Sequence, residues 1–169
     1  NCAGAFAGFD RMIGLEVPAI PVRGQILKYT TDHPWVERVI QSPRAYLVQR
    51  NTTSLIAGTT VEYVGFDKGV TQEGRRAISR GVEEMGSGLK ALTPSQSWAG
   101  LRPGTPDGLP ILGPTPLKQL LLATGHFRNG ILLAPLTGRM IADWVTRAQV
   151  FLDWSPFSVT RFLGHAAKS

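Results

Sequence analysis

Alternating apolar and polar positions predict an antiparallel β-sheet in the first two thirds of the chain. Residues 22–30 alternate apolar with polar side chains, and two further β-rich runs follow at 45–50 and 54–63. The short polar sequence Asn-Thr-Thr separates the last two runs, which is typical of a β-hairpin. Another strand is expected at 96–103, and an irregular, proline-stiffened turn at 105–113.

The hydrophobic period changes to that of a helix in two places. Within 68–92, Thr71 is placed to cap a helix with the apolar positions Ala77, Ile78, Val82, Met85 and Leu89. A buried strand at 119–124 precedes a second helix at 134–149, in which Pro135 suits the first turn. Its inward stripe is predicted to be Met140, Ile141, Trp144 and Val145. We therefore expect antiparallel β with one crossing helix, followed by strand–loop–helix.

Composition and charge narrow the possible classes of function. The chain has 169 residues, of which 43% are hydrophobic, and no stretch resembles a membrane span or a signal peptide. Its one cysteine, Cys2, excludes an intramolecular disulfide framework and favours the reducing cytoplasm. The net charge is +6, but the basic residues are scattered and the densest run is Arg75-Arg76. Nucleic-acid binding is therefore not expected, because it needs clustered basic residues.

The sequence "GHFRNGILLAP" at 125–135 places glycines, a histidine and an arginine before the apolar start of a helix. The unpaired N–H groups of a helix start carry partial positive charge. Gly125 and Gly130 have no Cβ that would obstruct a ligand, so an anion or an electron-rich ring would suit this site. The alternative is an ordinary turn with polar side chains.

Two further residues are candidates for binding a small carboxylate. Arg102 follows an apolar strand and precedes a proline, so its stem is expected to be partly buried and its guanidinium to need an anion. Asp107 is the alternative, internal partner. Tyr46 begins a strand and offers a hydroxyl to a polar ligand, although packing is the commoner role of such a tyrosine. No metal site is expected, because the three histidines lack ligand spacing and clustered acids.

Taken together, four stretches resemble the glycine oxidase and D-amino-acid oxidase family of flavoproteins, in particular the glycine oxidases of thiamine biosynthesis. They are "RGQ" (23–25), "GTTVEYVGFD" (58–67), "WAGLRPGTPDGLPILG" (98–113) and "ATGHFRNGILLAPLTG" (123–138). The family fold implies an α+β protein in which an antiparallel substrate domain with a crossing helix is inserted into a Rossmann-like FAD domain.

The resemblance also implies how this chain is divided. Residues 1–18 end an FAD-domain segment, and 19–98 form the substrate domain. The C-terminal strand–loop–helix part of the FAD domain is then 99–152, and 153–169 form a tail. The family's G-x-G-x-x-G motif and the acid that follows it are missing from this sequence. The chain is thus expected to be the C-terminal part of an oxidase whose N-terminal half is absent, and to be inactive alone.

Roles carry over from the family residue by residue. Arg102 matches the arginine that binds the substrate carboxylate, Tyr46 the tyrosine that assists it, and Arg128 a second arginine at the substrate. The loop along the flavin ring matches His126, Phe127, Arg128, Asn129, Gly130, Ile131 and Leu132. No residue is expected to act as a catalytic base.

The reaction implied is oxidative deamination of glycine or a small D-amino acid. A hydride passes from the substrate to noncovalently bound FAD, water hydrolyses the resulting imine to an oxo acid and ammonia, and molecular oxygen reoxidises the flavin with formation of hydrogen peroxide. A dehydrogenase of the same family, which uses another electron acceptor, is one alternative. A noncatalytic module that binds carboxylates or a protein partner is the other. The apolar surface that a truncated domain exposes would favour a homo-oligomer.

Overall fold

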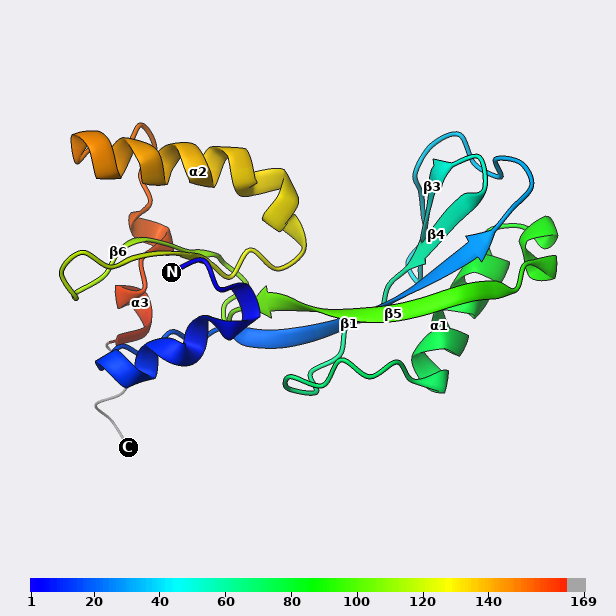
Figure 1. The fold of residues 1–169 in the computed structure, drawn as a ribbon, viewed down its shortest axis with the longest axis horizontal. Coiled ribbons are helices and arrows are strands. Elements are labelled where there is room, and N and C mark those ends of the chain that lie inside the picture. Colours follow the sequence, from blue (N-terminus) through cyan, green and yellow to red (C-terminus); the bar gives the residue numbers. More distant parts are fainter. Residues whose placement is uncertain (164–169) are drawn as a thin grey trace. The chain divides into compact units, whose positions relative to one another are not determined.

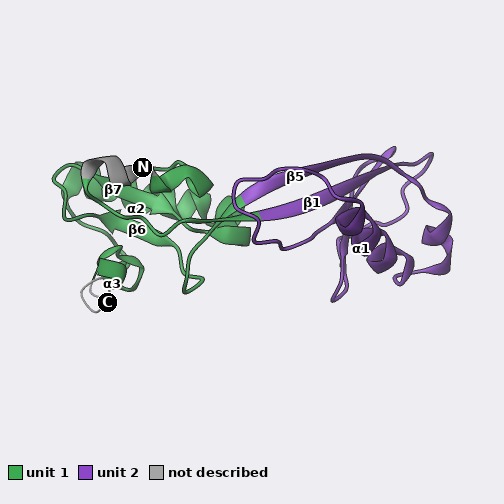
Figure 2. Cartoon of the chain, turned by 90° about the horizontal axis from the view of Figure 1, so that it is seen from below, with its two compact units in different colours: residues 1–22, 102–169 green, residues 23–101 purple. Residues whose placement is uncertain are grey.

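The computed structural model describes residues 1–163, with the side chains of 9–13 left aside. The chain divides into two compact units (Figure 2). One consists of Asn1–Val22 together with the part from Arg102 onward, and the other is Arg23–Leu101. Of the tail expected at 153–169, the last six residues lie outside the described part. The assignment of the two units to substrate and flavin binding stays a prediction.

The Arg23–Leu101 unit is built on an antiparallel sheet (Figure 1). The strand order is β2-β3-β4-β1-β5, with β1 Ile20–Thr30, β2 Ile40–Gln41, β3 Tyr46–Asn51, β4 Ser54–Gly58 and β5 Pro94–Gly104. The predicted hairpin is confirmed, since β3 and β4 pair with Leu47 opposite Ala57. The strand expected at 54–63 ends earlier, at Gly58, and Glu62 returns only as an isolated bridge to Arg23.

Helix α1, Gln72–Glu83, packs on one face of this sheet. Thr71 caps it as predicted, because its hydroxyl accepts a hydrogen bond from the Gly74 N–H at 3.1 Å. The helix stops short of the expected end at 92, since Gly86 adopts an extended backbone and a 3-10 turn, Ser87–Ala91, follows. The core between helix and sheet contains Leu27, Tyr29, Leu47, Leu55, Ala57, Ile78 and Val82.

The other unit contains the hairpin β6 (Ile111–Pro114) and β7 (Leu121–Thr124). Residues 111–113 were expected in an irregular turn but pair with β7, because Ile111 and Leu112 bury their side chains. The 3-10 helix Gly4–Ile13 is not announced by any sequence signal. The core of this unit contains Ala7, Leu15, Val17, Ile111, Leu122 and Val159.

Helix α2, Gly130–Arg147, begins four residues before the expected start at 134. The 3-10 turn Phe127–Asn129 leads directly into it, so Pro135 lies beyond the first turn. Met140 is buried as predicted, but Val145 is 66% exposed and does not belong to the inward stripe. After α2 come the 3-10 turn Ser155–Phe157 and the short helix α3, Thr160–Leu163. Within residues 1–163, no helix has the length and apolarity that a membrane span requires.

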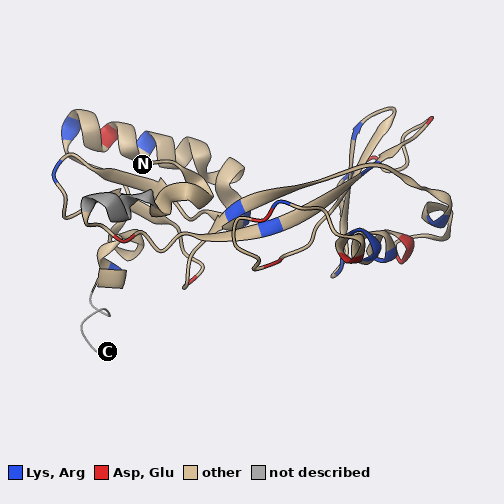
Figure 3. Ribbon diagram, turned by 60° about the horizontal axis from the view of Figure 1, so that its bottom comes forward, with Lys and Arg blue, Asp and Glu red and all other residues tan. Residues whose placement is uncertain are grey.

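Charges of both signs are distributed over the chain (Figure 3). Helix α1 carries both basic and acidic side chains, and Arg44, which lies between β2 and β3, forms an ion pair with Glu84 at the end of this helix. On α2, Arg139 binds Asp143 one turn away at 2.8 Å. Both side chains of the Arg44–Glu84 pair are exposed, so this pair contributes little to stability.

Candidate functional site

The segment between β7 and α2 forms a tight turn that ends at an open helix start. Gly125 and Phe127 both have positive φ, and the 3-10 turn Phe127–Asn129 leads into Gly130. Asn129 precedes the helix without making a side-chain capping hydrogen bond. No side chain of Asn129 therefore covers the start of α2, while the Asn129 N–H itself donates to the His126 carbonyl at 2.9 Å within the 3-10 turn. A helix start carries partial positive charge.

The side chains of this turn have different surroundings. His126 is half-buried, and its Nε2 lies 3.0 Å from the Thr137 hydroxyl, which ties the turn to the side of α2. Burial lowers the pKa of His126, so the neutral ring is favoured. Arg128 is exposed, and in the described part of the chain it makes no hydrogen bond or ion pair. Ile131 and Leu132 are 94% and 78% exposed, which is unusual for aliphatic side chains.

The two glycines of this segment serve different purposes. A Cβ on Gly125 would stand 2.6 Å from Thr105 Cγ2 and 3.2 Å from the Ile111 nitrogen, so the chain itself fills that space. The prediction that Gly125 leaves space for a ligand is therefore wrong. The absent Cβ of Gly125 leaves space for Thr105, in the turn after β5. A Cβ on Gly130 would have only the His126 Cβ, at 3.8 Å, within reach. Gly130 thus keeps the helix start open.

Arg102 lies in β5 and is partly buried, as expected. Asp107, the internal partner considered as an alternative for Arg102, is bound elsewhere. Both carboxylate oxygens of Asp107 accept hydrogen bonds from Arg161, at 2.7 Å from Nε and 3.1 Å from Nη2. These bonds from Arg161 hold the pKa of Asp107 at about 2, against the opposing effect of burial. The alternative of an Arg102–Asp107 pair is therefore not the arrangement found.

Tyr46 begins β3 in the Arg23–Leu101 unit, whereas Arg102 and Arg128 belong to the other unit. Its ring lies over Gly58 on the neighbouring strand, because a Cβ on Gly58 would stand 2.6 Å from the Tyr46 hydroxyl oxygen. The side chain is half-buried on the face of the sheet opposite Leu47. That Tyr46, Arg102 and Arg128 bind one carboxylate together stays a prediction.

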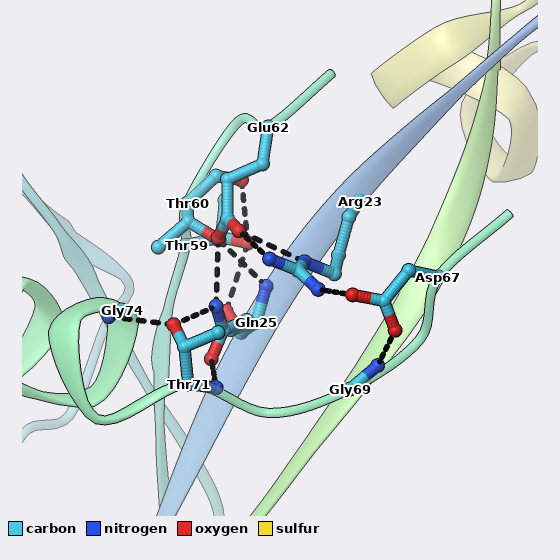
Figure 4. Close-up of polar contacts among 9 residues, drawn as sticks. All are labelled: Arg23, Gln25, Thr59, Thr60, Glu62, Asp67, Gly69, Thr71 and Gly74. Atoms are coloured by element: carbon cyan, nitrogen blue, oxygen red, sulfur yellow. Dashed lines mark hydrogen bonds and ion pairs between the residues drawn. The ribbon is translucent and has the colours of Figure 1, made fainter. Parts of the chain in front are cut away.

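A buried polar network was missed by the sequence reasoning (Figure 4). Arg23 on β1 is 4% exposed and forms ion pairs with Glu62 and Asp67 from the segment that connects β4 to α1. The Arg23 Nε donates to Glu62 Oε2 at 2.8 Å. Burial alone would raise the pKa of Glu62, but hydrogen bonds from Thr60, Arg23 and Gln25 keep it below its ordinary value.

The network continues from β1 to the start of α1. The fully buried Gln25 donates from Nε2 to Glu62 Oε1 at 2.8 Å and to the Thr71 hydroxyl at 2.9 Å. Its Oε1 accepts the Thr71 N–H at 2.9 Å. Except for Thr71, these residues lie in "RGQ" and "GTTVEYVGFD", two of the stretches that carry the resemblance. Their presence in one network shows that both stretches fix the segment between β4 and α1.

Metal binding finds no support in the described residues, where no three His, Cys, Asp or Glu side chains gather as a metal site would require.

The fold and these motifs agree with a match to a known protein family. The model of the DAO family, FAD dependent oxidoreductase, matches residues 1–144. The chain belongs to this family. Its predicted α+β fold with antiparallel sheets is confirmed, because solved members superpose on most of the chain.

Relatives of this DAO-family chain include glycine oxidases and an L-proline dehydrogenase. The glycine oxidase of Pseudomonas aeruginosa is 36% identical over 158 residues, which are 92% of this chain and 43% of the relative. The crystal structure of glycine oxidase from Geobacillus kaustophilus has a TM-score of 0.87 at 34% identity, covering 94% of this chain and 44% of that one. L-proline dehydrogenase from P. horikoshii has a TM-score of 0.86 at 25% identity, covering 97% and 46%. The chain thus spans less than half the length of these relatives.

The residues at the start of α2 fit a flavin ring. The exposed Ile131 and Leu132 offer apolar contact to a planar ring, and the uncapped N–H groups offer donors to its polar edge. Gly130 leaves the approach free of a side chain. The phosphate groups of FAD need different residues, since a dinucleotide glycine motif is not part of this sequence.

Proposed function

We propose that this chain supplies the amino-acid-binding residues and the flavin-ring loop of an FAD-dependent oxidase that acts on glycine or small D-amino acids. The proposal is supported by family membership and by the names of the glycine oxidase relatives. The structural observation behind it is the exposed cation of Arg128 two residues before the open start of α2. A carboxylate substrate and a ring that gains electrons both favour positive charge there.

In this proposal the chain's residues bind and orient the substrate. Arg102 and Arg128 hold the carboxylate through paired hydrogen bonds from their guanidinium groups. Fixing the carboxylate at several points directs the α-carbon and the neutral amine of the substrate. FAD, when bound, supplies the electron acceptor for the hydride, while the N–H groups at the start of α2 stabilise negative charge. No side chain of this chain is assigned the role of a base.

The proposed contact with FAD involves residues 126–132 and is noncovalent. The one cysteine of the chain, Cys2, precedes the 3-10 helix Gly4–Ile13 and lies outside the proposed flavin loop. We further propose that activity requires a polypeptide segment that binds the adenosine diphosphate part of FAD, which this chain does not provide. The single cysteine also supports the cytoplasm as the proposed compartment.

The experiment joins this chain to the N-terminal flavin-binding segment of a glycine oxidase relative. Flavin reduction is followed anaerobically with glycine and with small D-amino acids. Arg102→Leu and Arg128→Leu are expected to raise KM at least about tenfold, because loss of a charged hydrogen-bonding partner costs about 2–5 kcal/mol. The control is Arg147→Leu, which removes an exposed arginine at the end of α2. Unchanged kinetic constants in both test variants would exclude this carboxylate site.

The second candidate is a dehydrogenase that passes electrons to a carrier other than oxygen. It is favoured by the structural likeness to an L-proline dehydrogenase. The joined protein distinguishes the two, since an oxidase forms hydrogen peroxide in air at the rate of substrate oxidation. A dehydrogenase would reduce its flavin with substrate but turn over only with an added acceptor dye. If no amino acid reduces the flavin, the noncatalytic binding module becomes the better proposal.

A further inference from the structure

Arg161 uses every N–H group of its guanidinium within the chain. Besides the two bonds to Asp107, its Nη2 donates to the Leu109 carbonyl at 3.0 Å. Its Nη1 donates to the Phe157 carbonyl at 2.8 Å and to the Ser158 carbonyl at 3.0 Å. The Arg161 side chain is only 18% exposed. One arginine thus joins the C-terminal segment to the turn that follows β5.

This turn, Thr105–Leu109, depends on the bonds that Arg161 completes. The Gly108 N–H donates to the Thr105 carbonyl at 3.2 Å, and Gly108 has a φ of 75°, which favours glycine. The Thr105 hydroxyl donates to the Leu109 carbonyl at 2.8 Å, and the Leu109 N–H donates to Asp107 Oδ1 at 3.1 Å. Arg161 therefore binds the same carboxylate and the same carbonyl that close the turn.

The turn adjoins both stretches that the proposed function assigns to ligand binding. On the N-terminal side it continues β5, which carries Arg102. On its other side Thr105 and Ile111 pack directly against Gly125, where even a methyl group would meet Thr105 Cγ2 at 2.6 Å. Gly125 in turn precedes the loop of residues 126–130. If the turn shifts, Thr105, which packs against Gly125 at the start of the loop, moves with it, and so does the end of β5, which carries Arg102.

We propose that Arg161 is a positioning residue, which rests on the proposed function: by holding the turn Thr105–Leu109 it sets the places of Arg102 and of the loop 126–130. No direct contact with substrate or flavin is assigned to Arg161, since its guanidinium is used within the chain. Replacing Arg161 increases local opening of the turn and of the loop, whereas the hydrogen bonds between β6 and β7 remain as stable as before. The C-terminal segment is thus part of the ligand-binding apparatus.

Hydrogen exchange of the chain alone, without flavin or substrate, tests this role. In Arg161→Gln we expect the amides of Gly108 and Leu109 and those of residues 125–130 to exchange about tenfold faster, because a charged hydrogen-bond network is lost locally. The β6–β7 amides serve as the internal reference and should keep their rates. The matched control is Arg147→Gln, whose guanidinium is 69% exposed and lies 3.9 Å from Asp143.

Two further variants keep the test decisive if Arg161→Gln folds poorly. Asp107→Asn removes the carboxylate charge that Arg161 binds and should accelerate exchange in the same two segments. Arg161→Lys keeps the positive charge and should accelerate exchange there to a smaller degree. Equal acceleration throughout the unit would show a purely structural role and overturn the proposal, as would unchanged exchange at 105–109 and 125–130. The readout needs no catalysis, so a failed oxidase assay of the joined wild-type protein would refute the proposed function by itself.

Discussion

The side-chain amide of Gln25 occupies the space that any side chain on Gly74 would need. An ideal Cβ on Gly74 would stand 2.3 Å from Nε2 and 2.5 Å from Cδ of Gln25. Gln25 is fully buried, and its amide binds both Glu62 and Thr71, so it cannot withdraw without breaking those bonds. Helix α1 therefore reaches its place beside β1 because its third residue is glycine.

Replacing Gly74 by alanine is expected to lower the free energy of unfolding by about 1–3 kcal/mol, as overpacking of a tight core does. Urea unfolding followed by circular dichroism measures this. The control is Gly138→Ala in α2, where no atom lies within 4 Å of the new Cβ. There the better helix propensity of alanine should raise the free energy of unfolding by about 0.5–1 kcal/mol. Stabilisation by both substitutions would contradict the close contact between Gly74 and Gln25.

Glu62→Gln leaves the buried guanidinium of Arg23 with Asp67 as its other ionic partner in the network. The free energy of unfolding is expected to fall by about 2–4 kcal/mol, because the buried charge of Arg23 then lacks one of the carboxylates that compensate for its desolvation. Asp67→Asn is the matched control, because the Asp67 side chain is 60% exposed, so solvent screens its pair with Arg23 and its loss should lower the free energy of unfolding far less. Urea unfolding measures the free energy of unfolding of both variants. Equal decreases would show that the Arg23–Glu62 pair stabilises the fold no more than the exposed Arg23–Asp67 pair does.

The sequence predicted those parts of the fold that depend on neighbours along the chain. Thr71 caps α1 through the N–H of Gly74, three residues away, and the hairpin of β3 and β4 follows from alternation and a short polar turn. The network of Arg23 was not predicted, because its partners Glu62 and Asp67 lie 39 and 44 residues away. A charged residue in an alternating strand gives no sign of which distant segment will cover it.

The candidate site shows the same limit. The glycine-flanked stretch before α2 lies at a strand-to-helix junction, as the sequence indicated, because such a junction is a local feature, although the helix begins at Gly130 and not at 134. That this helix start binds a ligand stays a prediction. Gly125 carried the same sequence signal but serves internal packing, which depends on the distant Thr105. The alternative that Asp107 pairs with Arg102 rested on closeness in sequence, whereas the actual partner, Arg161, lies 54 residues further along the chain.

The pH dependence of stability should reveal the Asp107–Arg161 pair. The pKa of Asp107 is about 2 in the folded chain, against about 3.9 for an unfolded aspartate, so the unfolded state binds the proton more readily. The stabilisation is therefore complete above pH 5 and is lost as the pH falls from about 4 to about 2. Because the Asp107 side chain is 35% exposed, screening limits the effect to about 1 kcal/mol.

Urea unfolding of the wild type and of Asp107→Asn at several pH values measures this difference. The advantage of the wild type should be constant from pH 7 to about pH 5 and should shrink below pH 4. Asp67→Asn provides a comparison at a more exposed aspartate, whose pKa is also lowered, chiefly by the hydrogen bond from the Gly69 N–H. An Asp107→Asn deficit that persists undiminished at pH 3 would show that packing, and not charge, accounts for the effect of the substitution.

The exposed side chains at the start of α2 should matter for flavin retention and hardly for folding. Ile131→Ser and Leu132→Ser remove aliphatic groups that are 94% and 78% exposed, so the free energy of unfolding of the chain should change by less than about 0.5 kcal/mol. In the protein joined to a flavin-binding segment, the same substitutions should weaken FAD binding, because a buried aliphatic side chain contributes about 1.5–3 kcal/mol. Val145→Ser, at the other end of α2 and 66% exposed, is the control and should retain FAD like the wild type. Titration of the apoprotein with FAD measures the dissociation constants, and equal constants for all three variants would remove Ile131 and Leu132 from the proposed flavin loop.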